Sequence, residues 1–210
     1  MANNPGFQIS LNLQGRFCVV IGGEDEASHK TALLLASGAK VVVVNPTLNV
    51  SLRALTASGK ILHRGRRFRS TDTHGVFMIL NTLADDTDLA RSLHALSEAE
   101  RFLVWSADQP EWSNVMMPAV VQQGALRLAI STGGASPALA STLRKDCEEI
   151  FDEEFGKFVD WLGEVREEVR SGEPGVEQRR ARLKAAVAGF HLTGNIEYPP
   201  AWVTHRQSSD

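Results

Sequence analysis

The chain has 210 residues, of which 43% are hydrophobic and 22% charged, as in ordinary soluble globular proteins. This length suits one α/β domain with a modest helical extension. The net charge of −3 gives no reason to expect a nucleic acid or an anionic membrane as partner. No apolar run approaches the roughly 20 residues that span a bilayer, and the N-terminus lacks a signal-peptide pattern. The sequence therefore predicts a cytoplasmic protein.

Short apolar runs alternate with helix-like stretches through the first two thirds of the chain. In chain order, the expected elements are strand 17–21, helix 25–37, strand 40–44, strand 76–80, helix 87–100, strand 102–105, an apolar strand at 115–117 and strand 126–131. This order predicts a Rossmann-like, doubly wound and mostly parallel sheet. Cys18 falls in the first apolar run and reads as a small core residue. With Cys147 it forms neither a disulfide framework nor a metal site.

The last third of the chain is charged and helix-periodic. Apolar residues from Phe151 to Leu162 recur at helical spacing, which indicates a core or interface face. A break at 171–175 separates this stretch from a basic helix at 177–188, and a polar tail follows. We therefore expect a nucleotide-binding type of domain at 1–115, a dimerisation and substrate-site region at 116–145, a helical domain at 146–195 and a tail at 196–210.

The first strand leads into a glycine turn that resembles the dinucleotide fingerprint G-x-G-x-x-A. Gly22 supplies the tight turn, but Glu24 stands where the second glycine would let the backbone approach a diphosphate. Asp25 and Glu26 follow, and they suit the helix dipole better than a bound anion. The candidate nucleotide-binding residues are Gly22, Gly23, Glu24, Asp25, Glu26, Asn45, Pro46 and Thr47. Asn45 ends the second strand, where NAD-binding folds often place an acid for the ribose hydroxyls.

The segment 130–140, Ile-Ser-Thr-Gly-Gly-Ala-Ser-Pro-Ala-Leu-Ala, places many small residues between a strand and a helix started by Pro137. It closely resembles the corresponding segment of the precorrin-2 dehydrogenase and sirohydrochlorin ferrochelatase family, the N-terminal module of siroheme synthase. Further matches lie at 7–15, at the Gly22 turn, at 107–110 with 117–119, and in the helical tail. The resemblance spans roughly residues 7 to 190.

This resemblance implies a homodimer that oxidises precorrin-2 to sirohydrochlorin with NAD and inserts ferrous iron to give siroheme. Asp108 matches the family's implicated aspartate, which would accept protons in both steps and hold the iron transiently. The residues implied to bind the tetrapyrrole are Asn114, Ser131, Thr132, Gly133, Gly134 and Ser136. From the residues alone, a turn residue is the favoured interpretation of Asp108, and the alternative for the glycine-rich corner is a turn without a ligand.

Several features depart from the family pattern. Glu24 replaces a glycine, Glu26 replaces an apolar residue, and His29 replaces an arginine. In a partly desolvated turn, repulsion between Glu24 and a diphosphate would cost on the order of several kcal/mol. Two alternatives follow: a sirohydrochlorin chelatase that needs no NAD, and a tetrapyrrole-binding protein without catalysis.

The segment 63–69, His-Arg-Gly-Arg-Arg-Phe-Arg, is unusually basic. It could form a cationic rim for a polycarboxylate substrate. The alternative is a solvated edge of the sheet without a ligand. None of the six histidines has the spacing of a metal ligand.

Overall fold

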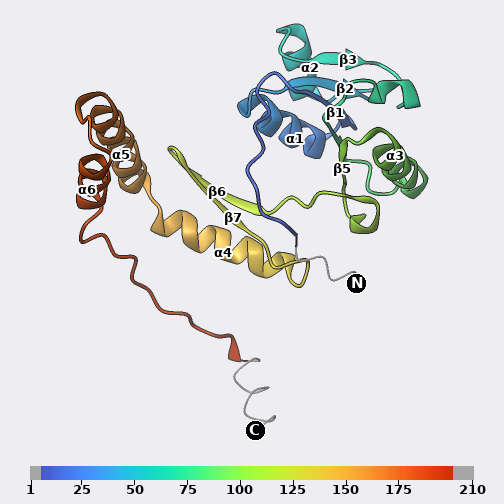
Figure 1. The fold of residues 1–210 in the computed structure, drawn as a ribbon. Coiled ribbons are helices and arrows are strands. Elements are labelled where there is room, and N and C mark those ends of the chain that lie inside the picture. The colour runs from blue at the N-terminus through green and yellow to red at the C-terminus, as the bar shows by residue number, and fades with distance from the viewer. Residues whose placement is uncertain (1–5, 201–210) are drawn as a thin grey trace. The chain divides into compact units, whose positions relative to one another are not determined.

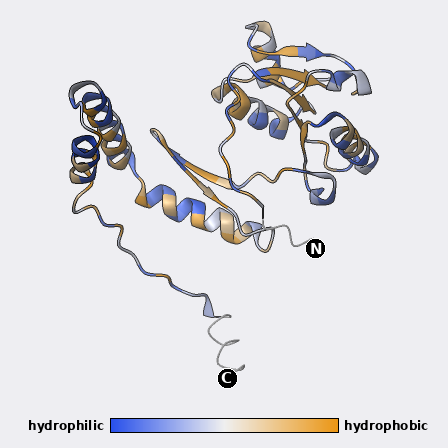
Figure 2. Cartoon of the chain, in the orientation of Figure 1, coloured by the Kyte–Doolittle hydropathy of each residue, from blue (hydrophilic) through white to orange (hydrophobic). Residues whose placement is uncertain are grey.

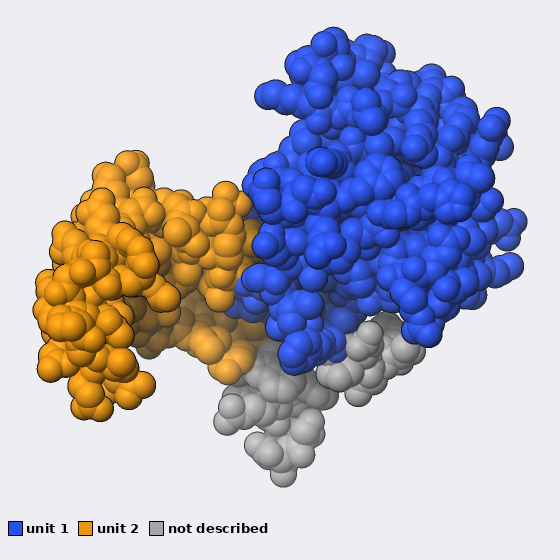
Figure 3. Space-filling view, turned by 45° about the horizontal axis from the view of Figure 1, so that its top comes forward, with its two compact units in different colours: residues 1–119, 129–144 blue, residues 120–128, 145–210 orange. Residues whose placement is uncertain are grey.

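The computed structural model describes residues 6–200, and it divides the chain into two compact units (Figure 3). The first, here called the sheet unit, comprises the residues up to Ala119 together with Ala129–Arg144. The second, here called the helical unit, comprises Val120–Leu128 and the residues from Lys145 onward.

A five-stranded parallel sheet in the order β3-β2-β1-β4-β5 organises the sheet unit (Figure 1). Its strands are β1 (Phe17–Ile21), β2 (Lys40–Val44), β3 (Leu62–Arg64), β4 (Met78–Asn81) and β5 (Leu103–Ser106). Between them lie α1 (Asp25–Ala36), α2 (Val50–Ala57), the 3₁₀ turn Ser70–Thr73 and α3 (Thr87–Glu100). A second 3₁₀ turn, Pro110–Trp112, follows β5. The expected doubly wound α/β fold is confirmed.

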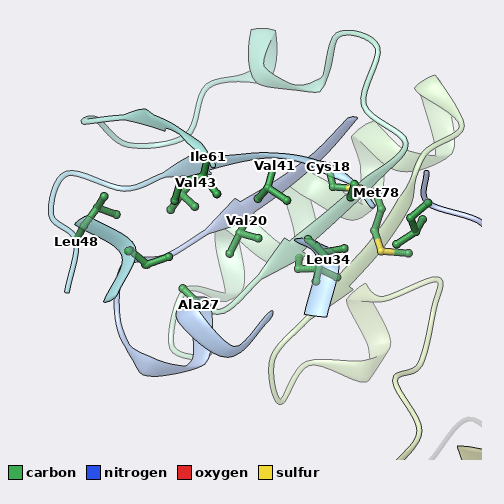
Figure 4. Close-up of a cluster of buried hydrophobic side chains, with 13 residues drawn as sticks. Cys18, Val20, Ala27, Leu34, Val41, Val43, Leu48, Ile61 and Met78 are labelled. Atoms are coloured by element: carbon green, nitrogen blue, oxygen red, sulfur yellow. The ribbon is translucent and has the colours of Figure 1, made fainter. Parts of the chain in front are cut away.

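The two faces of the sheet bury separate apolar clusters. On one face, Val20, Val41 and Val43 pack against residues of α1 and α2, as Figure 4 shows for Ala27 and Leu34 of α1. The opposite face packs against α3 through its buried Leu93. In β1, β2 and β4, side chains on both faces of the sheet are buried, because these strands are covered on both sides. Figure 2 colours these strands mostly hydrophobic. Cys18 lies in the first cluster, as expected.

A hairpin and three helices follow in the described part of the chain. They are β6 (Ala119–Gln123), β7 (Leu126–Ile130), α4 (Pro137–Ile150), α5 (Glu153–Gly172) and α6 (Val176–Ala186). In the helical unit, Phe155 and Phe158 pack against Phe190 with ring centroids 5.8 and 5.7 Å apart, and the residues of the expected apolar stripe are only partly buried. Residues 190–199 contain no helix or strand, and the remainder of the expected tail from 201 lies outside the described residues.

Two sequence expectations need correction, and two short elements were not expected. The apolar run 115–117 is not a strand, because Pro118 follows it and its start bonds back to Val104. The strand expected at 126–131 exists as β7, but it pairs with β6 outside the main sheet. The sequence also gave no indication of α2 and β3, which are only 8 and 3 residues long.

Candidate functional site

A cavity of about 530 Å³ lies within the sheet unit, next to the end of β5. It combines the turn after β5, the segment before β6, and the corner between β7 and α4. Its lining residues are Trp105, Ser106, Asp108, Gln109, Pro110, Ser113, Val115, Met116, Met117, Pro118, Ala119, Ile130, Ser131, Thr132, Gly134, Pro137, Ala140, Ser141 and Arg144. Asp108 and the glycine-rich corner, 23 residues or more apart in sequence, therefore face one cavity.

Asp108 occupies the first position beyond the end of β5 at which the backbone turns left-handed, with φ of 55°. Aspartate tolerates this conformation better than most residues. The adjacent Gln109 is 5% exposed, and its side-chain amide donates to the carbonyl of Ala84. Ser113 donates to the Gln109 carbonyl at 3.1 Å and accepts the Ser106 N–H at 2.9 Å. This network fixes the turn, and the Asp108 carboxylate itself stays exposed.

The corner between β7 and α4 contains two consecutive left-handed glycines, Gly133 and Gly134, with φ of 61° and 85°. The Thr132 hydroxyl exchanges hydrogen bonds with the backbone of Ser136, at 3.0 and 3.1 Å. Ser136 then accepts the Leu139 N–H at 3.2 Å and caps α4, as the sequence predicted. Gly133 and Ser136 shape this corner without lining the cavity.

Asn114 does not line the cavity. Its side-chain oxygen accepts the Val104 N–H at 2.7 Å, and its amide nitrogen donates to Ser97 Oγ and the Phe102 carbonyl at 3.2 and 3.1 Å. These three bonds tie the chain to β5 and α3. Asn114 therefore stabilises the backbone next to β5 and does not lie beside the other expected substrate residues.

A second cavity, of about 460 Å³, lies at the carboxyl ends of β1, β2 and β4, where parallel sheets of this topology bind nucleotides. Its lining combines apolar side chains with a few polar ones. The residues are Ile21, Val44, Asn45, Pro46, Thr47, Arg67, Phe68, Leu83, Asp86 and Leu89. Asn45, Pro46 and Thr47 were expected here. Arg67, Phe68 and Asp86 were not, since they come from loops whose return to this edge is not visible in the sequence.

The glycine turn adjoins this second cavity but does not line it. A Cβ at Gly22 would overlap Thr82 Oγ1, and one at Gly23 would overlap the Thr47 carbonyl oxygen. Both positions therefore require glycine. Glu24 follows as the exposed N-cap of α1, with a side chain that makes no capping bond.

The two acids after Glu24 have partners of their own. Asp25 accepts a hydrogen bond from the Asn49 amide at 3.0 Å, and Glu26 pairs with Lys30 at 3.1 Å. Glu26 is exposed, so it does not take the packing role of the apolar residue expected from the family pattern. The residues that line the second cavity thus fit the adenosine end of a dinucleotide. In contrast, the carboxylates of Glu24, Asp25 and Glu26 lie at the N-terminus of α1, which a diphosphate would approach.

The basic segment 63–69 is mostly committed to internal contacts. Asp72, whose side chain is fully buried, accepts two bonds of 2.7 Å from Arg66 and one from Arg64. The hydrogen bonds from Arg66, the Arg69 N–H and Arg64 lower the pKa of Asp72 from 3.8 to about 2. Of the two readings of this segment, the cationic rim for the substrate is therefore not supported for Arg64 and Arg66, whose guanidinium groups bind Asp72. Arg67 instead lines the second cavity.

Within residues 6–200, no cluster of three or more His, Cys, Asp or Glu side chains could hold a resident metal ion. No helix in that range is long and apolar enough to cross a membrane.

Comparisons with known proteins give matches along most of the chain. Residues 9–119 match the family described as "Putative NAD(P)-binding", and residues 123–149 match "Sirohaem biosynthesis protein central". A siroheme synthase of Xylella fastidiosa (strain M12) is 31% identical over 189 residues, which are 90% of this chain and 40% of that protein. One of Neisseria meningitidis serogroup C (strain 053442) is 33% identical over 174 residues, 83% of this chain and 36% of that protein. The chain thus spans about 40% of the length of these curated relatives.

The solved structure titled SirC, precorrin-2 dehydrogenase, superimposes with a TM-score of 0.74 at 26% identity. The match covers 88% of this chain and 90% of that chain. One family match covers more than half of the chain, and the structural match covers 88% of it. The sequence and the fold therefore indicate the same family. The chain belongs to the family that comprises precorrin-2 dehydrogenase and the N-terminal module of siroheme synthase.

Proposed function

We propose that this chain acts in siroheme biosynthesis, oxidising precorrin-2 to sirohydrochlorin and inserting ferrous iron, as a homodimer. The single observation that carries the proposal is that Asp108 and the corner residues Ser131, Thr132 and Gly134 line one cavity of one compact unit. A cavity of about 530 Å³ is in the range of small-molecule sites.

The lining suits a flat macrocycle fringed with carboxylates. Trp105, Met116 and Met117 provide apolar surface, and Arg144 brings a guanidinium that can bind a carboxylate. The left-handed backbone at Gly134 leaves open space where a side chain would lie, which lets a ligand approach the main chain.

Asp108 is the proposed proton acceptor. A bound dinucleotide would supply the hydride acceptor for the oxidation of precorrin-2, and the exposed Asp108 carboxylate would take up the proton lost from the macrocycle. The same carboxylate can receive the pyrrole protons that ferrous iron displaces, and it can hold the arriving iron transiently.

The test compares Asp108→Asn with wild type in two assays: formation of sirohydrochlorin from precorrin-2, and insertion of ferrous iron into sirohydrochlorin. Asparagine tolerates the left-handed φ of 55°, so the turn should persist. We expect both rates to fall by about 100-fold or more, because a positioned acid or base contributes that much. Tetrapyrrole affinity should change little.

Asp88→Asn is the matched control, since Asp88 is an aspartate on α3 whose side chain is 95% exposed. It should retain both activities. The proposal fails if Asp108→Asn keeps its rates, or if wild-type protein binds neither tetrapyrrole.

A chelatase that needs no NAD is the second candidate, favoured by the three carboxylates at the start of α1. It predicts iron insertion without precorrin-2 oxidation. Binding of sirohydrochlorin with neither turnover would instead support a non-catalytic tetrapyrrole-binding protein.

A further inference from the structure

We infer that Gln109 is a positioning residue for Asp108. Its side chain ties the turn after β5 to the loop after β4, and this tie holds the Asp108 carboxylate in place at the cavity. The inference deepens the proposed function and rests on it, because it names a second residue on which the proton transfers depend. Three observations support it: an Asp108 side chain without a partner, a buried amide that joins two loops, and a buried oxygen without a hydrogen bond.

The position of the Asp108 carboxylate depends on its backbone alone. Within residues 6–200, the Asp108 side chain has no hydrogen bond and no ion pair to hold it. Its direction is therefore set by the left-handed backbone, with φ of 55°. A residue other than glycine keeps such a conformation only where the surrounding structure restrains it.

Gln109 supplies that restraint. Its side-chain amide nitrogen donates to the carbonyl of Ala84, in the loop between β4 and α3. Its backbone carbonyl accepts the Ser113 hydroxyl and the Trp112 N–H, each at 3.1 Å. The residue is 5% exposed and lines the cavity beside Asp108. Gln109 is thus bonded to the neighbouring loop through its side chain and to its own turn through its backbone.

The side chain of Gln109 also contains an oxygen that packing alone would not favour. This atom, Oε1, is buried and has no hydrogen-bond partner within residues 6–200. The opposite orientation of the amide would place Oε1 against the Ala84 carbonyl oxygen, which is also an acceptor. An unpaired buried oxygen destabilises the folded state. Such a residue at the edge of a cavity indicates a role in the chemistry there rather than in stability.

The test is Gln109→Met, which keeps the length of the side chain and removes the amide. In both assays used for Asp108→Asn, we expect kcat to fall about tenfold, because a displaced carboxylate accepts protons less efficiently. KM for the tetrapyrrole should change by less than about twofold, since the effect is on the chemical step. The melting temperature should stay within about 3 °C of wild type, because removal of the unpaired Oε1 offsets the lost hydrogen bond.

Combination with Asp108→Asn separates positioning from a merely structural role. If Gln109 acts through Asp108, the double variant should be as slow as Asp108→Asn alone, within about threefold. Independent effects would instead multiply to a loss of about 1,000-fold. Gln14→Met, at an exposed glutamine that lines neither cavity of the sheet unit, is the matched control and should keep wild-type rates.

Amide hydrogen exchange reports on the turn independently of catalysis. Exchange in a peptide that covers residues 107–113 should become faster in Gln109→Met and stay at the wild-type rate in Gln14→Met.

Full rates in Gln109→Met, a multiplicative loss in the double variant, or unchanged hydrogen exchange would each overturn the inference. The proposed function fails by a different result, namely full rates in Asp108→Asn. A slow Asp108→Asn together with a fast Gln109→Met would thus reject the inference and leave the proposed function standing.

Discussion

Asp72 is the buried acid on which the segment between β3 and β4 depends. Its side chain is fully buried, and Arg64 and Arg66 compensate its charge while remaining about one third exposed. Replacing Asp72 with Asn removes the charge that both arginines face. We expect Asp72→Asn to lower the free energy of unfolding by about 2–3 kcal/mol, measured by urea denaturation at pH 7 with Asp88→Asn as control.

The pH dependence of that loss has a defined sign. The pKa of Asp72 is lowered from 3.8 to about 2 by its hydrogen bonds, so the ionised form favours the folded state. This contribution is present above pH of about 4 and disappears as the pH falls towards about 2. Denaturation at pH 7, 4 and 2.5 should therefore show the gap between wild type and Asp72→Asn closing on acidification. A gap of constant size would show that the charge of Asp72 is not its source.

Replacing Glu24 measures how much this one residue weakens dinucleotide binding. The sequence suggests a desolvated turn and a large penalty, but Glu24 is exposed, and water screens its repulsion of a diphosphate. We therefore expect Glu24→Gly to tighten NAD binding by only about tenfold, measured by calorimetry. Glu24→Gln serves as the comparison, because it removes the charge and keeps the bulk. Unchanged affinity in both variants would show that Glu24 already avoids the phosphates.

At the scale of elements, Asn49 joins α2 to the glycine turn and to α1. Its backbone N–H donates to the Gly23 carbonyl at 2.8 Å. Its side-chain oxygen accepts the Leu52 N–H and the Ser28 hydroxyl, each at 3.0 Å, and its amide nitrogen donates to Asp25. Asn49→Ala should cost about 1–2 kcal/mol and lower the melting temperature by roughly 3–6 °C. Asn49→Ser keeps a capping oxygen and should lose less. Equal losses in the two variants would assign the effect to something other than the cap.

The elements that sequence reasoning placed well are those with local start signals. The helix expected at 87–100 has its stated bounds because Asp86 caps it. The helix from Pro137 begins where Ser136 and the proline indicate. Both signals are contacts within three or four residues, which a sequence displays directly.

What the sequence could not supply are the contacts made at long range. The Asp72 network turns two of the arginines between residues 63 and 69 inward, although the segment itself looks like a free cationic run. Asn114 was expected to bind the substrate, but its side-chain oxygen accepts the Val104 N–H of β5 instead. Only the family resemblance predicts that Asp108 lies near the glycine-rich corner, because the two are 23 or more positions apart in the sequence.

For the whole molecule, the proposed homodimer requires an apolar surface that a monomer leaves exposed. On α4, Leu139 and Leu143 are 50% and 39% exposed, one helical turn apart. The neighbouring Ala140 and Arg144 line the Asp108 cavity. One helix thus contributes to the cavity and presents apolar side chains to solvent, so assembly and substrate binding should be linked.

Leu143→Glu should therefore convert a dimer of about 46 kDa, twice the 22.9 kDa chain, into a monomer in light scattering. A charged side chain in an apolar interface lacks a partner and disfavours association. Val176→Glu, at a 64% exposed position on α6, is the control and should remain dimeric. The monomer should also bind sirohydrochlorin more weakly, because α4 loses the packing that holds Ala140 and Arg144 at the cavity. A dimer that persists in Leu143→Glu would place the interface elsewhere, and a monomer with undiminished affinity would separate assembly from the site.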